Sequence, residues 1–312
     1  MQVNQYVLGI ELGGSHATVG VADRSRVLDR KRFDVAPQST LTSILPLLRE
    51  QLHLLLRNHH FQLAECAGLG MAFCGLVDVE RNRPWCIGEK YNDALDLDLT
   101  KWSRDNFSLP FRMDNDVRLA LMGESLGGAA RGCADVVLIQ LGTGFGTAAI
   151  MLGQPVRGRY SLAAARGGHF STTLTQTPCF CGNVGCVETE ASTWRLEEIS
   201  RRPEFQPTPG VKTLTFRNFR ELLHAVQEGA QHAKRLLDHC IRVWGASTIT
   251  LVHAYDANTV ILGGGIMRSP IVFPLLADYI RRHSWTPWGT LDVRRAELDD
   301  DAAILGTTSL FL

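Results

Sequence analysis

The chain has 312 residues, of which 45% are hydrophobic and 21% charged, a composition typical of a folded globular protein with room for two domains. Lysine plus arginine and aspartate plus glutamate both number 32, so the net charge is zero and no basic excess favours nucleic acid or an anionic membrane. No apolar stretch has the length of a membrane span, and the first residues lack the pattern of a signal peptide.

Five of the eight cysteines are scattered through apolar surroundings, which is typical of reduced core residues and predicts a cytoplasmic protein. They are Cys66, Cys74, Cys86, Cys133 and Cys240.

The chain begins with two short apolar runs separated by glycines. Tyr6–Leu12 and Ala17–Ala22 have strand length, and Gly13-Gly14-Ser15 between them predicts a hairpin turn. Such a turn leaves backbone N–H groups exposed, which suits a phosphate, although a plain hairpin has the same sequence. Three further elements are predicted, namely a strand at Val27–Val35, an amphipathic helix at Leu41–Leu56 and a buried strand at Ala67–Phe73.

Polar residues dominate the next part of the chain. Gly75–Asp78 predicts a turn, and residues 80–105 are predicted to be irregular, with Asn92 in a turn of its own. A short strand at Phe111–Met113 then runs into Asp114-Asn115-Asp116, before a helix at Val117–Leu126. These acidic and amide side chains either cap the helix or present one carboxylate as a general base, and the local sequence leaves both open.

The strand–turn–strand pattern then repeats. Val136–Leu141 and Thr147–Leu152 flank the turn Gly142-Thr143-Gly144-Phe145-Gly146, and Ile10–Thr18 aligns with Ile139–Thr147 at matching Ile, Leu, Gly and Thr positions. Two such units imply a duplicated domain whose turns face across a cleft. A pair of glycine turns favours phosphate binding more than either turn alone.

The last third of the chain predicts helices and one more glycine-rich turn. The predicted elements are helices within 193–230 with a break near 203–209, a long helix at Ala233–His253, a strand at Thr259–Leu262 and a closing helix at Asp301–Leu312. Gly263-Gly264-Gly265 after the strand allow either close approach of a flat ligand or a tight turn.

Three thiols and an imidazole lie close together in the sequence. Cys179, Cys181 and Cys186 follow His169, a donor set typical of a closed tetrahedral zinc site. A disulfide is disfavoured because two of the thiols are separated by a single residue. Four protein ligands leave no open position, so we expect structural zinc that fixes a loop carrying Glu188.

In these motifs the chain resembles the ROK family (repressors, open reading frames, kinases) of bacterial sugar kinases, within the actin-like ATPase superfamily. The motifs that carry the resemblance, in the family's order, are Asn115-Asp116, Leu141-Gly-Thr-Gly144-x-Gly146, Cys179-x-Cys181-Gly-x-x-Gly185-Cys186-x-Glu188 and Ile261-Leu-Gly-Gly-Gly265. The resemblance covers nearly the whole chain. It implies an α/β fold with two actin-like (ribonuclease H-like) domains, 1–116 plus 300–312 and 117–299, facing across a cleft, with a zinc loop at 169–188.

The resemblance also implies a function, that of an ATP-dependent sugar kinase of the glucokinase type acting at the 6-hydroxyl of a hexose or hexose derivative, with Mg²⁺ beside ATP. Asp116 would be the general base. The implied sugar contacts are Asn92, Asn115, His169 and Glu188, with Arg166 beside them. The implied nucleotide and phosphate contacts are Glu11, Gly13, Gly14, Ser15, Gly142, Thr143, Gly144 and, against the adenosine, Gly263, Gly264 and Gly265.

Three positions depart from the family pattern. The first turn reads Glu11-Leu12-Gly13-Gly14-Ser15-His16 instead of Asp-x-Gly-Gly-Thr-Lys, and Cys74-Gly75 replaces Pro-Gly. Arg166-Gly167-Gly168-His169 replaces Glu-x-Gly-His. The arginine implies a lost hexose contact, a substrate with an anionic group, or a side chain turned outward.

A second reading is a non-catalytic sugar-binding regulator of the same family. Its repressors carry an added N-terminal DNA-binding segment, and the glycine turn at residue 13 leaves no room for one, so we expect no nucleic-acid or membrane partner. We expect a homodimer. The sequence does not specify the sugar.

Overall fold

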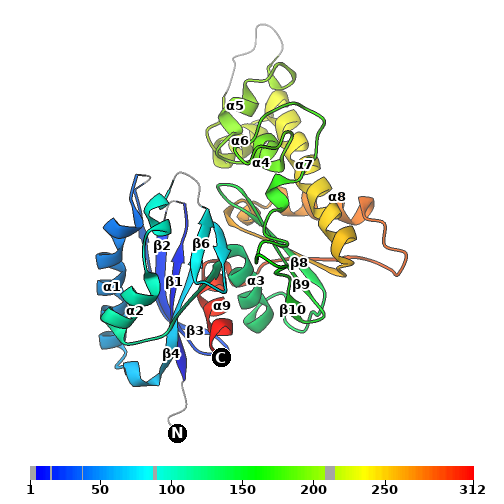
Figure 1. Ribbon diagram of the computed structural model, residues 1–312. Coiled ribbons are helices and arrows are strands. Elements are labelled where there is room, and N and C mark those ends of the chain that lie inside the picture. The colour runs from blue at the N-terminus through cyan, green and yellow to red at the C-terminus, as the bar shows by residue number, and fades with distance from the viewer. Residues whose placement is uncertain (1–4, 15, 37, 87–89, 208–214) are drawn as a thin grey trace. The chain divides into compact units, whose positions relative to one another are not determined.

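The computed structural model describes residues 5–14, 16–36, 38–86, 90–207 and 215–312, with the side chain of Cys86 left out (Figure 1). Contacts between Cα atoms divide the chain into two units. Unit 1 comprises residues 1–134, 148–165 and 296–312, and unit 2 comprises residues 135–147 and 166–295. The expected boundaries at 116 and 300 remain a prediction. No helix in the described part of the chain is long and apolar enough to cross a membrane.

Unit 1 is built on a five-stranded mixed sheet with the order β3-β2-β1-β4-β7. β1 pairs antiparallel with β2 and parallel with β4, β2 pairs antiparallel with β3, and β4 pairs parallel with β7. The strands are β1 (Tyr6–Leu12), β2 (His16–Ala22), β3 (Val27–Asp34), β4 (Cys66–Phe73) and β7 (Phe111–Asn115). A small second sheet pairs β5 (Leu76–Asp78) with β6 (Arg83–Cys86).

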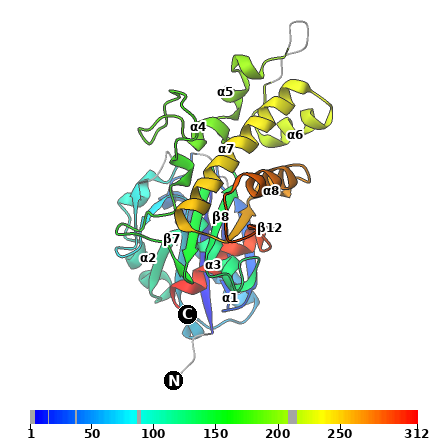
Figure 2. The ribbon, with the colours of Figure 1, turned by 90° about the vertical axis from the view of Figure 1, so that its right-hand side faces the viewer.

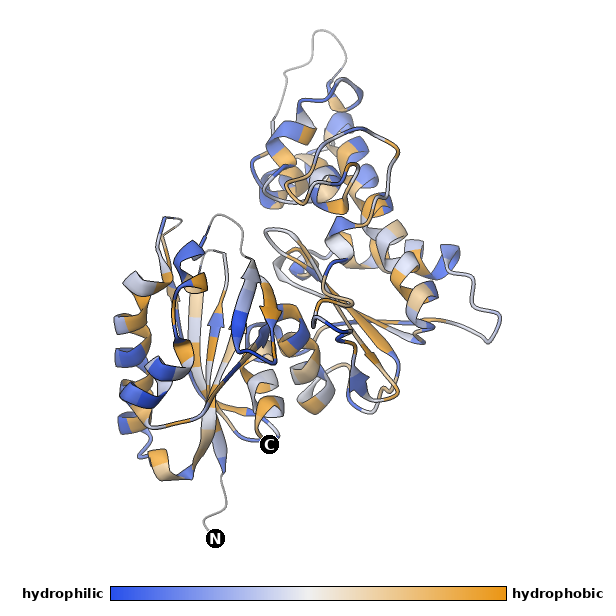
Figure 3. Cartoon of the chain, viewed as in Figure 1, coloured by the Kyte–Doolittle hydropathy of each residue, from blue (hydrophilic) through white to orange (hydrophobic). Residues whose placement is uncertain are grey.

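Helices cover both faces of this sheet (Figure 1). The helices of unit 1 are α1 (Leu41–Asn58), α2 (Leu99–Phe107), α3 (Asp116–Gly127) and α9 (Ala302–Gly306). α1 begins where the Thr40 side chain accepts a hydrogen bond from Ser43 N–H, and its leucines recur at helical spacing against the sheet. The outward faces of α1 and α2 are hydrophilic (Figure 3).

The opposite face of the sheet is lined by glycines where α9 approaches. A side chain at Gly9 or Gly20 would clash with Ile304, and one at Gly70 would clash with Thr307. The absence of a Cβ at these three positions therefore allows α9 and the turn after it to lie directly on the strands.

The second sheet has the order β10-β9-β8-β11-β12, with β8 pairing parallel with β11 and β11 parallel with β12, and β9 antiparallel with β10. Its strands are β8 (Val136–Leu141), β9 (Phe145–Met151), β10 (Gln154–Pro155), β11 (Thr259–Gly263) and β12 (Asp292–Arg295). Strand for strand, the order repeats that of the first sheet. The two sheets confirm the duplication that the glycine turns predicted. β9 carries the chain from unit 2 into unit 1.

The helices of unit 2 are α4 (Val187–Ala191), α5 (Leu196–Ser200), α6 (Phe219–Gln227), α7 (Gln231–Tyr255) and α8 (Val272–His283). α7 is the longest. It runs from α6, at its N-terminal end, to the strand β8 (Figure 2). α8 packs on it where the Tyr279 ring lies against Gly245.

Three local predictions were wrong. Most of the predicted turn Gly75–Asp78 is a strand, β5 (Leu76–Asp78), which pairs with β6 in a hairpin where Asp78 Oδ1 accepts a hydrogen bond from Arg81 N–H. Residues 80–105 contain β6, the 3₁₀ turn η2 (Asn92–Leu95) and α2, and are therefore not irregular. The closing segment is helical only to Gly306, after which Thr307–Leu310 form a 3₁₀ turn.

Candidate functional site

The four predicted zinc ligands converge in unit 2. The ligand atoms of His169, Cys179, Cys181 and Cys186 all lie within 4.8 Å of one another. Cys179 Sγ lies 3.6 Å from His169 Nδ1, and Cys181 Sγ lies 3.8 Å from Cys186 Sγ. In a tetrahedral zinc site the bond lengths place two sulfurs about 3.8 Å apart, and a sulfur and a nitrogen about 3.6 Å apart. The donor set therefore fits zinc in both chemistry and spacing.

Backbone geometry folds the loop toward this point. Gly182 and Gly185 have φ angles of 88° and 64°, in the left-handed region that favours glycine. The Asn183 carbonyl oxygen accepts from Cys179 N–H, and its side-chain amide donates to the His169 carbonyl oxygen. The loop is thus held from within at each end of the cluster.

Glu188 connects this loop to the second glycine turn. It lies in the first turn of α4, two residues after the last cysteine. Its Oε1 accepts a hydrogen bond of 2.7 Å from Phe145 N–H, and its Oε2 accepts one of 2.7 Å from Trp194 Nε1. A side chain at Gly144 would lie 2.6 Å from Oε1, so only glycine allows the carboxylate to pack against the turn. The metal loop therefore fixes a carboxylate whose remaining lone pairs are available for hydroxyl groups.

Two other predicted sugar contacts lie near this carboxylate in unit 2. The His169 ring is partly buried, and burial, opposed by Glu188 and aided by Arg166, lowers its pKa and favours the neutral imidazole that binds metals. The Arg166 side chain is exposed and forms no hydrogen bond or ion pair with any residue that the structure describes. Arg166 is close enough to influence His169 electrostatically.

In unit 1, Asp116 is the first residue of α3 and Asn115 is its N-cap. Asn115 Oδ1 accepts from Arg118 N–H, and its Nδ2 donates to the Gly75 carbonyl oxygen and to Asp116 Oδ1. Capping, one of the two alternatives left open by the sequence, is thus the role of Asn115, whereas a general-base role for the neighbouring Asp116 carboxylate stays a prediction. Burial raises the pKa of Asp116 to about 7, despite hydrogen bonds from Val117 N–H and Asn115 that lower it.

A second carboxyl group, that of Glu11, belongs to the same unit. It lies near the end of β1, opposite Thr18 on β2. Burial first, and then the charge of Asp116, raise the pKa of Glu11 to about 7. Its Oε2 is buried and has no hydrogen-bond partner among the residues that the structure describes. A desolvated carboxylate oxygen without a partner suits a divalent cation, so the residues present fit Mg²⁺.

The first glycine turn joins β1 to β2. Gly13 N–H donates to the His16 carbonyl oxygen, while Ser15, a predicted phosphate contact, lies outside the described residues. Two residues that the sequence did not indicate contact this turn. Lys90 Nζ lies 2.7 Å from the Gly14 carbonyl oxygen, and the Tyr91 hydroxyl donates to the Gly13 carbonyl oxygen at 3.3 Å. Asn92, the predicted sugar contact, follows directly and is exposed.

The second and third glycine turns border a cavity of about 850 Å³ within unit 2. Gly142, Thr143 and Gly265 line it. Gly264 has a φ of 90°, and a side chain there would clash with the Leu141 carbonyl oxygen, so the third turn is tight. Because Gly265 lines the cavity, the same turn is also accessible to a ligand. The other lining residues are Thr193, Asn218, Phe219, Arg220, Leu223, His224, Gln227, Ile266, Arg268 and Ser269.

No motif in the sequence indicates the α6 side of this cavity. Phe219, Leu222 and Ala225 are the buried face of an amphipathic helix, and that periodicity was visible. The neighbouring residues Asn218, Arg220 and His224 that line the cavity carry no motif, because their role depends on where α6 packs.

Comparison with known proteins gives consistent matches. The family model described as "ROK family" matches residues 7–312. A glucokinase of Thermotoga maritima is 25% identical over 319 residues, which cover 97% of this chain and 96% of the relative. The DNA-binding transcriptional dual regulator NagC of Escherichia coli is 22% identical over 304 residues, covering 96% of this chain and 74% of the regulator.

Among solved structures, a ROK family glucokinase from Streptomyces griseus in complex with glucose and AMPPNP superimposes with a TM-score of 0.76. It is 24% identical, and the match covers 98% of this chain and 99% of that one. This likeness confirms the predicted fold.

Proposed function

We propose that this chain, which belongs to the ROK family, is a kinase that transfers the γ-phosphate of ATP to the 6-hydroxyl of a hexose or hexose derivative. The observation that carries the proposal is the Asp116 carboxyl group, fixed at the start of α3 with a pKa of about 7. A general base is most effective when its pKa is near the working pH.

Asp116 has one role in this proposal. Its ionised carboxylate accepts the proton of the attacking sugar hydroxyl as the bond to phosphorus forms. Asn115 and Val117 N–H hold one oxygen, Oδ1, and so orient the carboxylate while the other oxygen remains available to the hydroxyl. Phosphoryl transfer depends on such positioning and on neutralisation of charge.

The phosphates are assigned to the glycine turns. Backbone N–H groups of Gly14, Thr143 and Gly144 are the proposed donors, while the N–H groups of Gly13 and Gly142 already donate to carbonyl oxygens within their turns. Glu11 would hold Mg²⁺ through the carboxylate oxygen that lacks a protein partner. Mg²⁺ held there would supply positive charge that neutralises part of the charge of the phosphates. The cavity in unit 2, with Gly263–Gly265 at its edge, would take the adenosine.

The proposed sugar contacts are polar side chains of the zinc loop, of α4 directly after it, of the α3 N-terminus and of η2. Glu188 accepts from sugar hydroxyls, the outer ring nitrogen of His169 donates to one, and Asn115 and Asn92 complete the proposed set. Zinc held by the four ligands would keep His169 and the loop before Glu188 rigid, and these residues, not the metal, would contact the sugar. Arg166 is the residue through which the substrate range would differ from that of a neutral-hexose kinase.

An ATP-consumption screen over neutral sugars, amino sugars and sugar acids tests the proposal. At least one sugar should increase ATP consumption by the wild-type protein well above the sugar-free rate, and Asp116→Asn should abolish that increase. The product should carry phosphate at its 6-hydroxyl, as detected by phosphorus NMR. An inert wild-type protein that nevertheless binds a sugar would contradict the kinase assignment.

The second candidate is a sugar-responsive regulator that does not turn over ATP. The similarity to NagC favours it, as does the cation at Arg166. Its signature is sugar affinity that is unchanged in Asp116→Asn and independent of ATP. A sugar-stimulated loss of ATP in the wild-type protein would exclude it.

A further inference from the structure

The first glycine turn has a cation beside it that comes from a different segment of the chain. Lys90 Nζ donates to the Gly14 carbonyl oxygen at 2.7 Å and reaches the Val35 carbonyl oxygen at 3.5 Å. It also lies 4.9 Å from the centre of the Tyr91 ring. An ammonium group has three N–H donors, so these two carbonyls leave one free.

The segment that carries Lys90 is firmly held. Tyr91 is 1% exposed, and its hydroxyl donates to the Gly13 carbonyl oxygen at 3.3 Å. Asp93, two residues on, accepts hydrogen bonds from the N–H groups of Leu41 and Thr42 at the start of α1. Lys90 is therefore placed at the turn by a docked segment and is not a long side chain on an open surface.

The described residues of the turn itself carry no reliable positive charge, and the nearby Arg32 on β3 is paired with Asp300. His16 follows it, but burial and the charge of Arg32 lower the pKa of this imidazole, so it is neutral at pH 7. A glycine turn offers backbone dipoles alone, whereas transfer of a phosphoryl group also requires cations at its oxygens.

Lys90 also belongs to the same electrostatic neighbourhood as the two carboxyl groups. The half-buried Cys74 thiol, after β4, is influenced by the charges of Asp116, Lys90 and Glu11 together. The ammonium group and the two carboxyl groups therefore all act electrostatically on one thiol of unit 1. Burial lowers the pKa of the Lys90 amine, and an anion beside it would favour the charged ammonium form.

We propose that Lys90 is a phosphate-binding residue whose ammonium group contacts the phosphates of the nucleotide at the first glycine turn. This inference rests on one part of the proposed function, namely that the protein binds ATP, and it does not depend on transfer of a phosphate to a sugar. In the resting protein the ammonium group is held by Gly14, and it keeps that contact while its free N–H donates to a phosphate oxygen.

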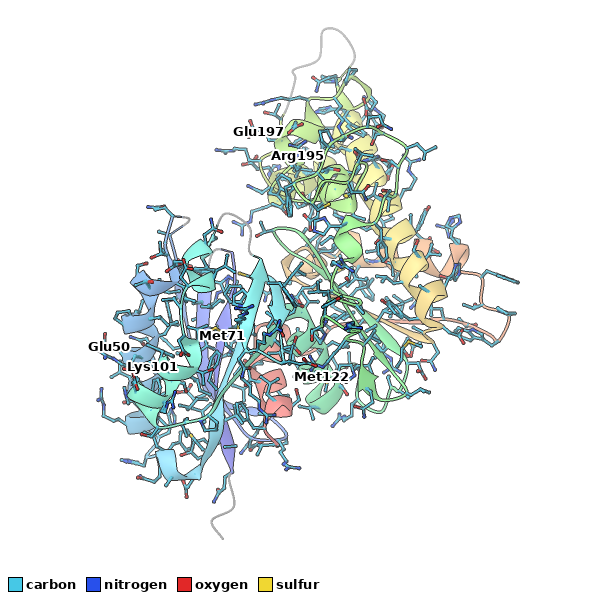
Figure 4. All side chains as sticks on the ribbon, in the orientation of Figure 1. Glu50, Met71, Lys101, Met122, Arg195 and Glu197 are labelled. Atoms are coloured by element: carbon cyan, nitrogen blue, oxygen red, sulfur yellow. The ribbon has the colours of Figure 1, made fainter. Side chains whose placement is uncertain are left out.

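Affinities for ATP and adenosine, measured by calorimetry without sugar, test the proposal. Lys90→Gln should weaken ATP binding about tenfold or more, as expected for loss of a hydrogen bond between charged groups, and should leave adenosine binding unchanged. Lys90→Arg should retain most of the ATP affinity. The matched control is Lys101→Gln on α2, where the lysine is exposed and paired with Asp105 (Figure 4).

A purely structural lysine would give a different result. Lys90→Gln would then lower the melting temperature while the ratio of adenosine to ATP dissociation constants stayed as in wild type, and that result would overturn the proposal. Amine acylation of the wild-type protein, read by mass spectrometry, needs no variant. ATP should protect Lys90 several-fold, adenosine should not, and Lys101 should react equally in all samples. Equal labelling of Lys90 with and without ATP would equally refute it.

The two proposals can fail separately. A wild-type protein that binds ATP through Lys90 but phosphorylates no sugar contradicts the kinase and leaves the Lys90 site intact. An active kinase with an unchanged affinity ratio in Lys90→Gln contradicts only the Lys90 site.

Discussion

At the scale of single residues, the unusual feature of unit 1 is a pair of carboxyl groups that are both hard to ionise. Glu11 and Asp116 each have a pKa of about 7, mainly because burial disfavours the charged form. Ionisation of such a buried carboxyl group lowers the free energy of unfolding. Groups of this kind are typical of sites that bind a cation or transfer a proton. They give two predictions about Asp116.

The first concerns pH. Because only the ionised carboxylate of Asp116 accepts a proton, kcat/KM should rise about tenfold per pH unit below about 7 and level off above it. Initial rates between pH 5.5 and 8.5, with saturating Mg²⁺, measure this profile. A rate independent of pH across that range would show that Asp116 is not the base.

The second concerns stability. The folded-state pKa of Asp116 is raised above the unfolded value of about 3.9, so only the unfolded chain loses this proton between about pH 4 and 7. Stability therefore falls as pH rises through that window, and the cost is complete above pH 7. Asp116→Asn should lower kcat by about 10²–10⁴ while leaving the melting temperature at pH 8 equal or higher. A variant that is active and less stable would contradict both roles.

Arg166 gives a residue-scale prediction about specificity. Its exposed guanidinium has no protein partner among the described residues, and it lies near His169. Arg166→Glu should therefore shift relative kcat/KM from anionic toward neutral hexoses, because a fixed cation becomes an acceptor of hydroxyl groups. Arg242→Glu, an exposed position on α7, is the control. Unchanged ratios in Arg166→Glu would place the side chain outside the sugar site.

At the scale of elements, zinc bound to His169 and the three cysteines would fix the loop that leads into Glu188. Cys186 is fully buried and is followed within two residues by Glu188, whose carboxylate is bonded to Phe145 N–H and Trp194. Loss of the metal would leave those two hydrogen bonds as the main restraint on the side chain.

Elemental analysis of the purified protein should therefore give about one zinc per chain. Cys181→Ser should lower zinc content and raise the KM for sugar more than that for ATP, since the loop serves the sugar side. Cys133→Ser, at a half-buried cysteine remote from the cluster in sequence, should change neither value. A folded wild-type protein without zinc would defeat the assignment.

Some elements could be predicted because their signals are local. The glycine turns, the cysteine spacing and the leucines of α1 depend on neighbours within a few residues. α2 was missed because its nine residues are largely polar, and its helix depends on the Asp98 cap and on packing of Leu99 and Phe107. β12 was missed because Asp292–Arg295 contains three charged residues and becomes a strand only by pairing with β11.

At the scale of the whole molecule, the duplication was predictable and the assembly of each site was not. Ile10–Thr18 and Ile139–Thr147 share a pattern in sequence, and the two sheets repeat one strand order. The contact of Lys90 with Gly14, in contrast, joins residues 76 positions apart in the chain. No periodicity encodes such a contact, because it depends on how η2 docks against α1.

The division into two units predicts which segments adenosine, a ligand without phosphates, protects from hydrogen exchange. Every residue that lines the 850 Å³ cavity belongs to unit 2. Adenosine should therefore slow amide hydrogen exchange in 142–143, in α6 and in 265–269, while leaving β1, β2 and β4 unchanged, because binding stabilises the segments that it contacts. ATP should add protection at the first glycine turn. Hydrogen exchange read by mass spectrometry measures both patterns, and equal protection of the unit 1 strands by adenosine would contradict the assignment of the nucleoside to unit 2.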